Sequence, residues 1–296
     1  SERWWNGFTG REGTPSAHPG DRILLRKQGG IPMRKYTETA LIYFKAQLIW
    51  RADTVFNMLF TVTKIIFAYV LWDAIFEGKE MIAGFTFHSM LSYYIISSFL
   101  SQIEMSGGIS REISSRIRTG TFSKYMVIPV NIEKYFLAME TGVVAFHLLF
   151  DFLAAVVWIF IFRIRFAFTR DIFTIACAVI MVILGLVFMV QLNYYLGLLT
   201  LRFEEINTFL MIKDNLISLI TGTIVPLTLL PEGMIAWMRV LPFYYVTYLP
   251  SMLFTGRCRD EALRGVLVLT LWCIFMELLN RRTYQKYRLR YDGVGI

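Results

Sequence analysis

The chain has 296 residues, of which 56% are hydrophobic, 16% aromatic and only 18% charged, and its formal net charge is +8. Soluble domains carry about 25% charged residues, so this composition excludes an ordinary soluble protein. The apolar residues form blocks of a length that crosses a bilayer, and the basic residues lie between and beyond these blocks. That distribution is typical of membrane topology and argues against a nucleic-acid partner. We therefore predict an all-α integral membrane protein.

The first segment, residues 1–32, is polar, rich in glycine and proline and without periodicity. It contains no apolar core of signal-peptide length, so we do not expect a cleavable signal. Met33, followed by Arg34 and Lys35, resembles a natural start. We expect the residues before it to be a disordered or non-native tail.

A connecting segment follows at residues 33–52. Within Tyr36–Arg51, the apolar residues Leu41, Phe44 and Leu48 fall at helical spacing, although other apolar residues blur the pattern. This predicts a helix that lies in the interface at the inner leaflet. The alternative, that the segment extends the first membrane span, stays open.

The remaining residues, 53–296, form one predicted membrane domain with six spans. Each span must satisfy its own backbone hydrogen bonds in lipid, which predicts helices. The connections on the amino-terminal side hold 21 Lys and Arg residues, and those on the opposite side hold seven. Because Lys and Arg accumulate on the cytoplasmic side, we expect both termini in the cytoplasm. The expected location is the inner or plasma membrane of the cell. The predicted spans are Asp53–Phe76, Phe85–Met105, Tyr135–Phe162, Ile172–Leu201, Phe209–Leu230 and Ala262–Leu279.

The segment between the fifth and last spans is apolar but interrupted by proline. Repeated prolines break a spanning helix, so short re-entrant or interfacial helices are expected here. Its aromatic residues suit the boundary between lipid and water. The prolines are Pro226, Pro231, Pro242 and Pro250, and the aromatic residues are Trp237, Tyr244, Tyr245 and Tyr248.

Several polar residues lie inside predicted spans. Lys64 in the first span and Asp151 in the third are placed at depths that favour an ion pair, because a lone charge in lipid is costly. A substrate path is the alternative role for this pair. Gln191 and Asn193 lie between two glycines in the fourth span and are interpreted as hydrogen-bonding residues of helix packing.

Motifs for intrinsic chemistry are not found in the sequence. It has no G-x-x-x-x-G-K-[ST] phosphate loop, no H-E-x-x-H, no C-x-x-C and no G-x-S-x-G. The three cysteines lack metal-ligand spacing, so no metal site is predicted. We expect the chain to bind no cofactor itself.

The connection between the second and third spans, residues 109–130, reads ISREISSRIRTGTFSKYMVIPV. Ile109, Ile113 and Ile117 recur every four residues among arginine, glutamate and serine, which predicts a short amphipathic helix that ends near Gly120. A helix with one apolar ridge and exposed arginines suits a groove on a partner protein.

This stretch resembles the pattern I-x-x-x-I-R-x-G-T-[LF]-x-x-Y-[LM]-x-x-P of permeases in ABC-2-type ATP-driven exporters. The six spans, the amino-terminal interfacial helix and the broken helices before the last span are also similar to that family. The ending RRTYQKYRLRYDGVGI resembles the R-Y-x-G-x-G end of a subgroup with paired permeases.

The resemblance implies a permease subunit that works with two ABC ATPase subunits, which would hold ATP and Mg, and with a second permease, either a related chain or a second copy. Membrane lipid would surround the subunits, and the substrate would pass between the two permeases. The implied ATPase-coupling residues are Arg111, Glu112, Ser115, Arg118, Gly120, Thr121 and Tyr125 in the coupling helix and its turn, with Arg202, Glu204 and Glu205 in the next inner connection. The candidate pathway residues are Phe60, Lys64, Tyr93, Tyr94, Phe99 and Thr221.

Two other functions are considered. An intramembrane enzyme would use Glu140, His147 or Asp151, which lie in one span, but a second carboxylate-rich span is missing from the sequence. An ion-coupled carrier would use Lys64 and Asp151, but the chain shows no internal duplication. Co-purification with an ATPase separates the exporter from both.

Overall fold

The computed structural model describes residues 32–49, 51–82, 84–101, 106–127, 131–161, 166–203, 205–220, 227 and 230–288. Among these residues, regular structure is helical apart from one isolated β-bridge between Ile82 and Phe85, which confirms the predicted all-α class. The longer helices are α2 (Pro32–Gln47), α3 (Arg51–Phe76), α4 (Phe87–Leu100), α5 (Gly107–Arg118), α7 (Ile132–Ile161), α8 (Ile172–Leu198), α10 (Asn207–Ile220) and α13 (Ala262–Tyr287). The shorter ones are α6 (Ser123–Val127), α9 (Thr200–Phe203), α11 (Glu232–Met238), η3 (Tyr244–Tyr248), α12 (Leu249–Phe254) and η4 (Arg259–Glu261).

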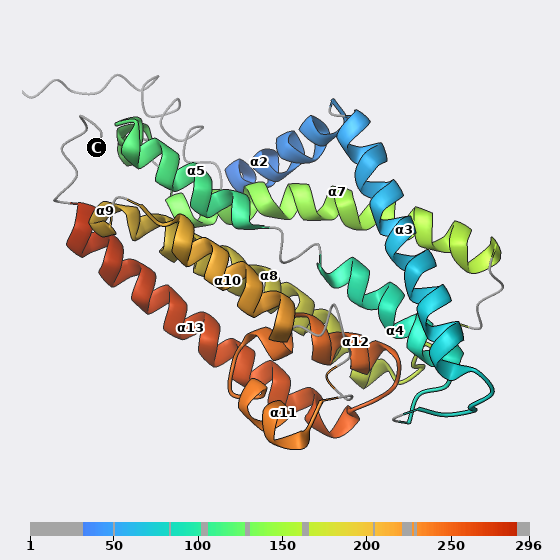
Figure 1. The fold of residues 1–296 in the computed structure, drawn as a ribbon. Coiled ribbons are helices and arrows are strands. Elements are labelled where there is room, and N and C mark those ends of the chain that lie inside the picture. The colour runs from blue at the N-terminus through green and yellow to red at the C-terminus, as the bar shows by residue number, and fades with distance from the viewer. Residues whose placement is uncertain are drawn as a thin grey trace, which may run out of the picture.

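Helices α8 and α13 pack against each other along their length, and α13 lies at the edge of the molecule (Figure 1). Gly265 on α13 permits close packing, because a Cβ there would lie 2.7 Å from Leu249 Cδ2 and 2.9 Å from Met181 Cε. Asp171 contacts the start of both helices. Its carboxylate accepts a hydrogen bond from the Thr174 amide at 3.2 Å, which caps α8, and lies 3.3 Å from Arg259 just before α13.

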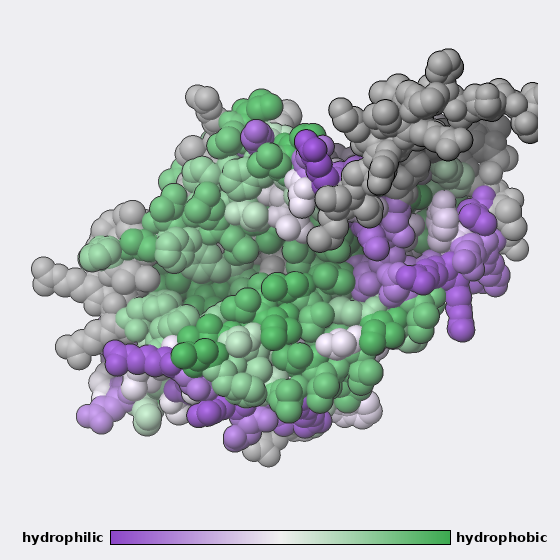
Figure 2. Space-filling view, turned by 180° about the vertical axis from the view of Figure 1, so that it is seen from behind, coloured by the Kyte–Doolittle hydropathy of each residue, from purple (hydrophilic) through white to green (hydrophobic). Residues whose placement is uncertain are grey.

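Three stretches of the described residues are long and apolar enough to cross a membrane: Ile132–Leu153, Ile172–Phe203 and Arg259–Tyr287. Many of their outward side chains are apolar, and Figure 2 shows a broad apolar surface between polar regions at two ends of the molecule. An exposed apolar surface of this extent indicates contact with lipid or with another membrane subunit. Helices α3, α4 and α10 coincide with three further predicted spans. That these three helices cross the membrane stays a prediction.

The helix ends differ from the predicted spans at several positions. The second helix ends at Leu100, where a span to Met105 is predicted, and α5 starts at Gly107. The third starts at Ile132 rather than Tyr135, and the last continues to Tyr287. A hydropathy window follows the apolar stretch alone, so polar turns that extend a helix at either end are missed.

The predicted interfacial helix is α2, and it packs along α7. The two backbones touch at Gly142, where a side-chain Cβ would overlap the carbonyl oxygen of Ala40. The Tyr43 and Tyr135 hydroxyls lie 3.0 Å apart, and the Phe44 ring meets Phe146 edge to face. The structure therefore fixes α2 to the first half of α7.

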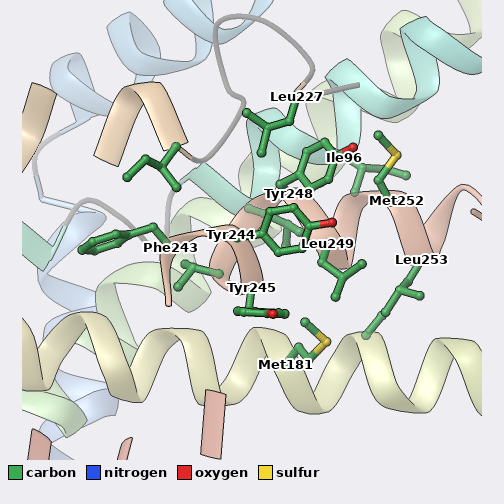
Figure 3. Close-up of a cluster of buried hydrophobic side chains, with 14 of the residues drawn as sticks. Ile96, Met181, Leu227, Phe243, Tyr244, Tyr245, Tyr248, Leu249, Met252 and Leu253 are labelled. Carbon is green, nitrogen blue, oxygen red and sulfur yellow. The ribbon is translucent and has the colours of Figure 1, made fainter. Parts of the chain in front are cut away.

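Over its described residues, the proline-interrupted segment folds as the short helices α11, η3 and α12 (α11 and α12 are labelled in Figure 1). Tyr244, Tyr245 and Tyr248 are buried in the core with Phe243, Leu249, Met252 and Leu253 (Figure 3). Their predicted place at the boundary of lipid and water is wrong, because the π-helical turn at Tyr244–Tyr248 directs them towards α8 and α4. Trp237 on α11 is 79% exposed, and its place at the boundary of lipid and water stays a prediction.

Gly142→Ala tests the contact between α2 and α7. Alanine normally favours a helix, but here its methyl group would collide with the Ala40 backbone, so we expect the free energy of unfolding to fall by about 1–3 kcal/mol. Gly108→Ala is the control, because a Cβ at Gly108 meets nothing within 4 Å. Thermal unfolding in detergent measures both, and equal melting temperatures for the two variants would contradict this packing.

Candidate functional site

The isoleucine ridge of α5 lies inside the chain. Ile109, Ile113 and Ile117 are all 0% exposed and pack in one cluster with Phe136 of α7 and Tyr194 of α8. The prediction that this ridge would enter a groove on a partner is therefore wrong. An amphipathic pattern shows that one face is covered, and here α7 and α8 of the same chain cover it.

A glycine on α8 allows α5 to approach closely. A Cβ at Gly197 would lie 2.8 Å from Ile113 Cβ, closer than side chains tolerate. The Ile113 side chain therefore packs directly on the backbone of α8 at Gly197. The opposite face of α5 carries Arg111, Ser115 and Arg118, all exposed, and only this charged face is available to a partner.

The turn after α5 is closed by local hydrogen bonds. Gly120 has φ +72°, the left-handed conformation that glycine adopts without strain. The Phe122 amide donates to the Arg116 carbonyl at 3.0 Å, and the Thr119 and Thr121 hydroxyls lie 3.0 Å apart. The G-T pair of the motif therefore makes the turn.

The tyrosine of the motif ties this turn back to α5. The Tyr125 hydroxyl donates to Glu112 Oε1 at 3.0 Å, and Arg116 donates to the same oxygen from Nε at 3.0 Å and Nη2 at 2.9 Å. The Arg116 guanidinium also lies 4.9 Å from the centre of the Tyr125 ring. Burial raises the pKa of the Tyr125 hydroxyl above its ordinary value, and the Glu112 carboxylate raises it further. Tyr125 therefore remains a hydrogen-bond donor at physiological pH.

The second predicted connection lies beside α5. Arg118 Nη1 is 3.2 Å from Glu205 Oε2, and Arg111 Nη2 is 3.8 Å from Asp214 Oδ2. Exposed ion pairs contribute little to stability, but these two bring segments about 90 to 100 residues apart onto one surface. We call Arg111, Ser115, Arg118, Glu205 and Asp214 the charged surface.

Other residues of the predicted coupling set lie around the charged surface. Arg202 on α9 donates from Nη1 to the Tyr287 hydroxyl at 3.3 Å, which links this end to the end of α13. Glu204 lies outside the described residues.

A buried polar network beneath the charged surface was missed by the sequence reading. Lys213 Nζ donates to Asn193 Oδ1 at 2.9 Å and lies 2.8 Å from Asp214 Oδ1. Asn193 Nδ2 donates to Ser106 Oγ at 2.7 Å and to the Met189 carbonyl at 2.9 Å. Two features of the sequence could have indicated this network. Lys213 lies within an apolar helix, and Asn193 of α8 was interpreted only as a packing residue. This network joins α10 to α8 and to the start of α5.

The predicted pathway residues that the structure describes do not share one exposed surface. Tyr93 is 0% exposed and packs against Phe85 and Tyr248, so it belongs to the core of this chain and not to a surface facing a second permease. Phe60 is exposed on α3, while Tyr94 and Phe99 on α4 are half-buried. Thr221 and the side chain of Lys64 lie outside the described residues.

The residues considered for the alternative functions lie on α7. Asp151 is buried, as an ion pair with Lys64 requires, and this pair stays a prediction. Glu140 is buried and His147 half-buried. Among the described residues there is no group of three His, Cys, Asp or Glu side chains that could hold a metal ion.

Comparison with known protein families identifies the family of this chain. A family model described as "ABC-2 family transporter protein" matches residues 60–295, which include both segments of the charged surface. The chain belongs to the ABC-2 transporter family. No curated protein matches it. Membership makes this ABC-2 protein an integral membrane component of an ABC transporter rather than a catalytic enzyme.

A double-mutant cycle of Lys213→Met and Asn193→Leu tests the buried network of this ABC-2 protein. Each single change leaves a buried polar partner unsatisfied, so each should lower the free energy of unfolding by about 1–3 kcal/mol. We expect the double variant to lose less than the sum, with a coupling energy of about 0.5–3 kcal/mol. Denaturation in detergent measures all four proteins, and additive losses would contradict the network.

Proposed function

We propose that this chain is the transmembrane permease subunit of an ATP-driven exporter and that the charged surface is its docking site for an ATPase subunit. The observation that carries the proposal is the joining of two distant connections at one end of the molecule by Arg118–Glu205 and Arg111–Asp214. A partner that contacts this surface would touch α5 and the α9–α10 connection together. Family membership supplies the class of partner, an ABC ATPase.

The packing beneath the surface supports transmission of movement. The isoleucine ridge and Gly197 leave α5 no room to slide over α8, so a force on the charged face would move both helices. ATP and Mg would be held by the ATPase subunits, whose number we propose to be two. The end of the molecule that carries the charged surface would face the cytoplasm, together with both chain termini.

A second permease would complete the transporter. Helix α3 exposes Phe56, Leu59 and Phe60, and α10 exposes Phe209 and Met211, which gives apolar surface for another membrane subunit as well as for lipid. We propose that the cargo passes between the two permeases, with Phe60, Tyr94 and Phe99 as the described candidates for contact. The partner permease is a related chain or a second copy.

The docking site is tested by reversing charge on the exposed face. The double variant Arg111→Glu/Arg118→Glu keeps the buried ridge and should reduce co-purification of the ATPase at least about tenfold, because two cations of the docking face become anions. Arg170→Glu is the control, since Arg170 is exposed in the connection before α8. Association is measured by pull-down, and insertion by membrane fractionation.

Substitution is more informative here than deletion of residues 110–124. That deletion would remove Ile113, Ile117 and Phe122 from the core and destabilise the protein for another reason. Undiminished ATPase association of the Arg111→Glu/Arg118→Glu variant would overturn the docking assignment.

The transmission of movement is tested by joining α5 to α8. Asn193→Cys on α8 and Ser106→Cys at the start of α5 replace two side chains that meet at 2.7 Å, where oxidation should form a disulfide. If the helices move as one body, the oxidised complex should retain the ATPase activity of the complex reduced with dithiothreitol within about twofold. Loss of activity on oxidation, restored by reduction, would show instead that α5 must move over α8. Each single-cysteine variant serves as a control for the native cysteines.

A further inference from the structure

The outward face of α13 carries a continuous apolar stripe. Leu271, Phe275 and Leu278 recur at helical spacing and are 66%, 52% and 52% exposed. The opposite face of α13 packs on α8, where Asn280 Nδ2 donates to the Gln191 main-chain carbonyl at 3.1 Å. Because α13 lies at the edge of the molecule, the described part of the chain leaves this stripe uncovered (Figure 1).

The stripe contains an open groove. Its described lining residues are Leu271, Trp272 and Phe275, and its volume is about 270 Å³. The Trp272 ring meets the Phe188 ring of α8 and the Phe275 ring edge to face, with centroids 6.4 Å and 5.6 Å away, so one wall of the groove is held in place. Sites for compact small molecules measure about 300–1,000 Å³. A smaller groove with an apolar lining suits a single hydrocarbon chain.

The same stripe ends in polar side chains. Arg282 lies four residues after Leu278, and Lys286 lies four residues after Arg282, so both continue the outward face of the helix. Gln285 lies beside them, and all three side chains are exposed. One face of α13 is therefore apolar along its middle and basic at its end.

The two cations of this face have no neutralising partner in the described part of the chain. The neighbouring Arg281 is held by Glu277, with Nη2 2.6 Å from Oε1. Among the described residues, no carboxylate forms an ion pair with Arg282 or Lys286. Basic residues next to the end of a membrane-crossing helix attract anionic lipid headgroups. The charge of this end is therefore complementary to such a headgroup.

The distance between the groove and the cations matches the dimensions of a lipid. Arg282 follows Leu271 by 11 residues and Phe275 by seven. At 1.5 Å per residue, the groove lies roughly 10–16 Å along the helix from Arg282. The hydrocarbon layer of one leaflet is about 15 Å deep, half of the bilayer core. A lipid whose headgroup lies at Arg282 therefore has an acyl chain that reaches the groove.

We propose that the outward face of α13 binds one anionic phospholipid, with its phosphate at Arg282 and Lys286 and one acyl chain in the groove. Gln285 can donate a further hydrogen bond to the headgroup. A zwitterionic headgroup would bring its own cation close to the two basic residues, so it binds more weakly. The site depends on α13 crossing the membrane, for which the helix is long and apolar enough. It needs no ATPase and stands independently of the exporter assignment.

The test is native mass spectrometry of the purified full chain in detergent, with phosphatidylglycerol or phosphatidylcholine of identical acyl chains. We expect one phosphatidylglycerol to remain bound to each chain and phosphatidylcholine to bind at least about tenfold more weakly. Thermal unfolding in the same detergent gives a second readout. Phosphatidylglycerol should raise the melting temperature by roughly 2–4 °C, as binding to the folded state requires.

Arg282→Ala/Lys286→Ala removes the two cations and keeps the groove. It should weaken phosphatidylglycerol binding about 25-fold, because each cation near an anionic headgroup contributes about fivefold. Lys124→Ala/Lys134→Ala is the matched control, since both lysines are exposed and lie away from α13. This control should bind phosphatidylglycerol as the unchanged protein does.

Leu271→Trp tests the groove. The larger side chain fills it, so the bound fraction of phosphatidylglycerol should fall at least about twofold as the acyl chain loses its packing contacts. Leu263→Trp is the control on the same helix, because Leu263 is 58% exposed and does not line the groove. Its lipid binding should stay unchanged.

Four results would overturn the site. The first is equal binding of phosphatidylglycerol and phosphatidylcholine, which would mean ordinary contact with bulk lipid. The second is unchanged phosphatidylglycerol binding in Arg282→Ala/Lys286→Ala or in Leu271→Trp. The third is an equal rise in melting temperature with inorganic phosphate, which would mean an anion site without the groove. The fourth is a lipid-free dimer that Leu271→Trp abolishes, which would assign this face to a second copy of the chain.

Discussion

The contact between α5 and α8 is the constraint on which the proposed coupling depends. Three isoleucines of α5 are buried against α7 and α8, and the absence of a side chain at Gly197 brings the helices together. Burial of an isoleucine side chain stabilises by about 1.5–3 kcal/mol, whereas an exposed ion pair contributes little. The apolar ridge therefore holds α5 in place, and the charged face is free to recognise a partner.

Much of the fold follows from the sequence because lipid imposes simple rules. Long apolar blocks must be helices, and α3, α7, α8 and α13 lie where hydropathy predicts them. The sequence predicts less directly which element covers a buried face. The spacing of the isoleucines shows that Ile113 is covered, but it does not show which element covers it. Tyr244 and Tyr245 are apolar enough either for the boundary of a lipid bilayer or for a protein core. Their burial depends on the π-helical turn, which no local pattern announces.

Polar residues determine how the apolar helices are positioned. Apolar side chains pack with similar energy in several registers, so a lysine that must reach Asn193 or an amide that must reach a carboxylate selects one of them. Lys213 fixes α10 to α8, and Asn280 fixes α13 to α8. Both bonds end on α8. Sequence patterns show such residues as isolated polar positions, and their partners become visible only when the helices are assembled.

Helix α8 links the two ends of the molecule. Near its carboxyl-terminal end, α8 contacts α5 through Gly197. Three turns earlier, a Cβ added at Gly185 would lie 3.4 Å from Val246 Cγ1 in the tyrosine-rich turn η3. That turn is held by Tyr244, which donates to Glu261 Oε2 at 3.1 Å, while Arg239 bonds Glu261 Oε1 at 2.7 Å. Contacts made at glycine are close, because the neighbouring side chain rests directly on the backbone of α8. In the proposed coupling, a displacement of α5 would be passed through α8 to η3, and the short helices at the far end would respond to it.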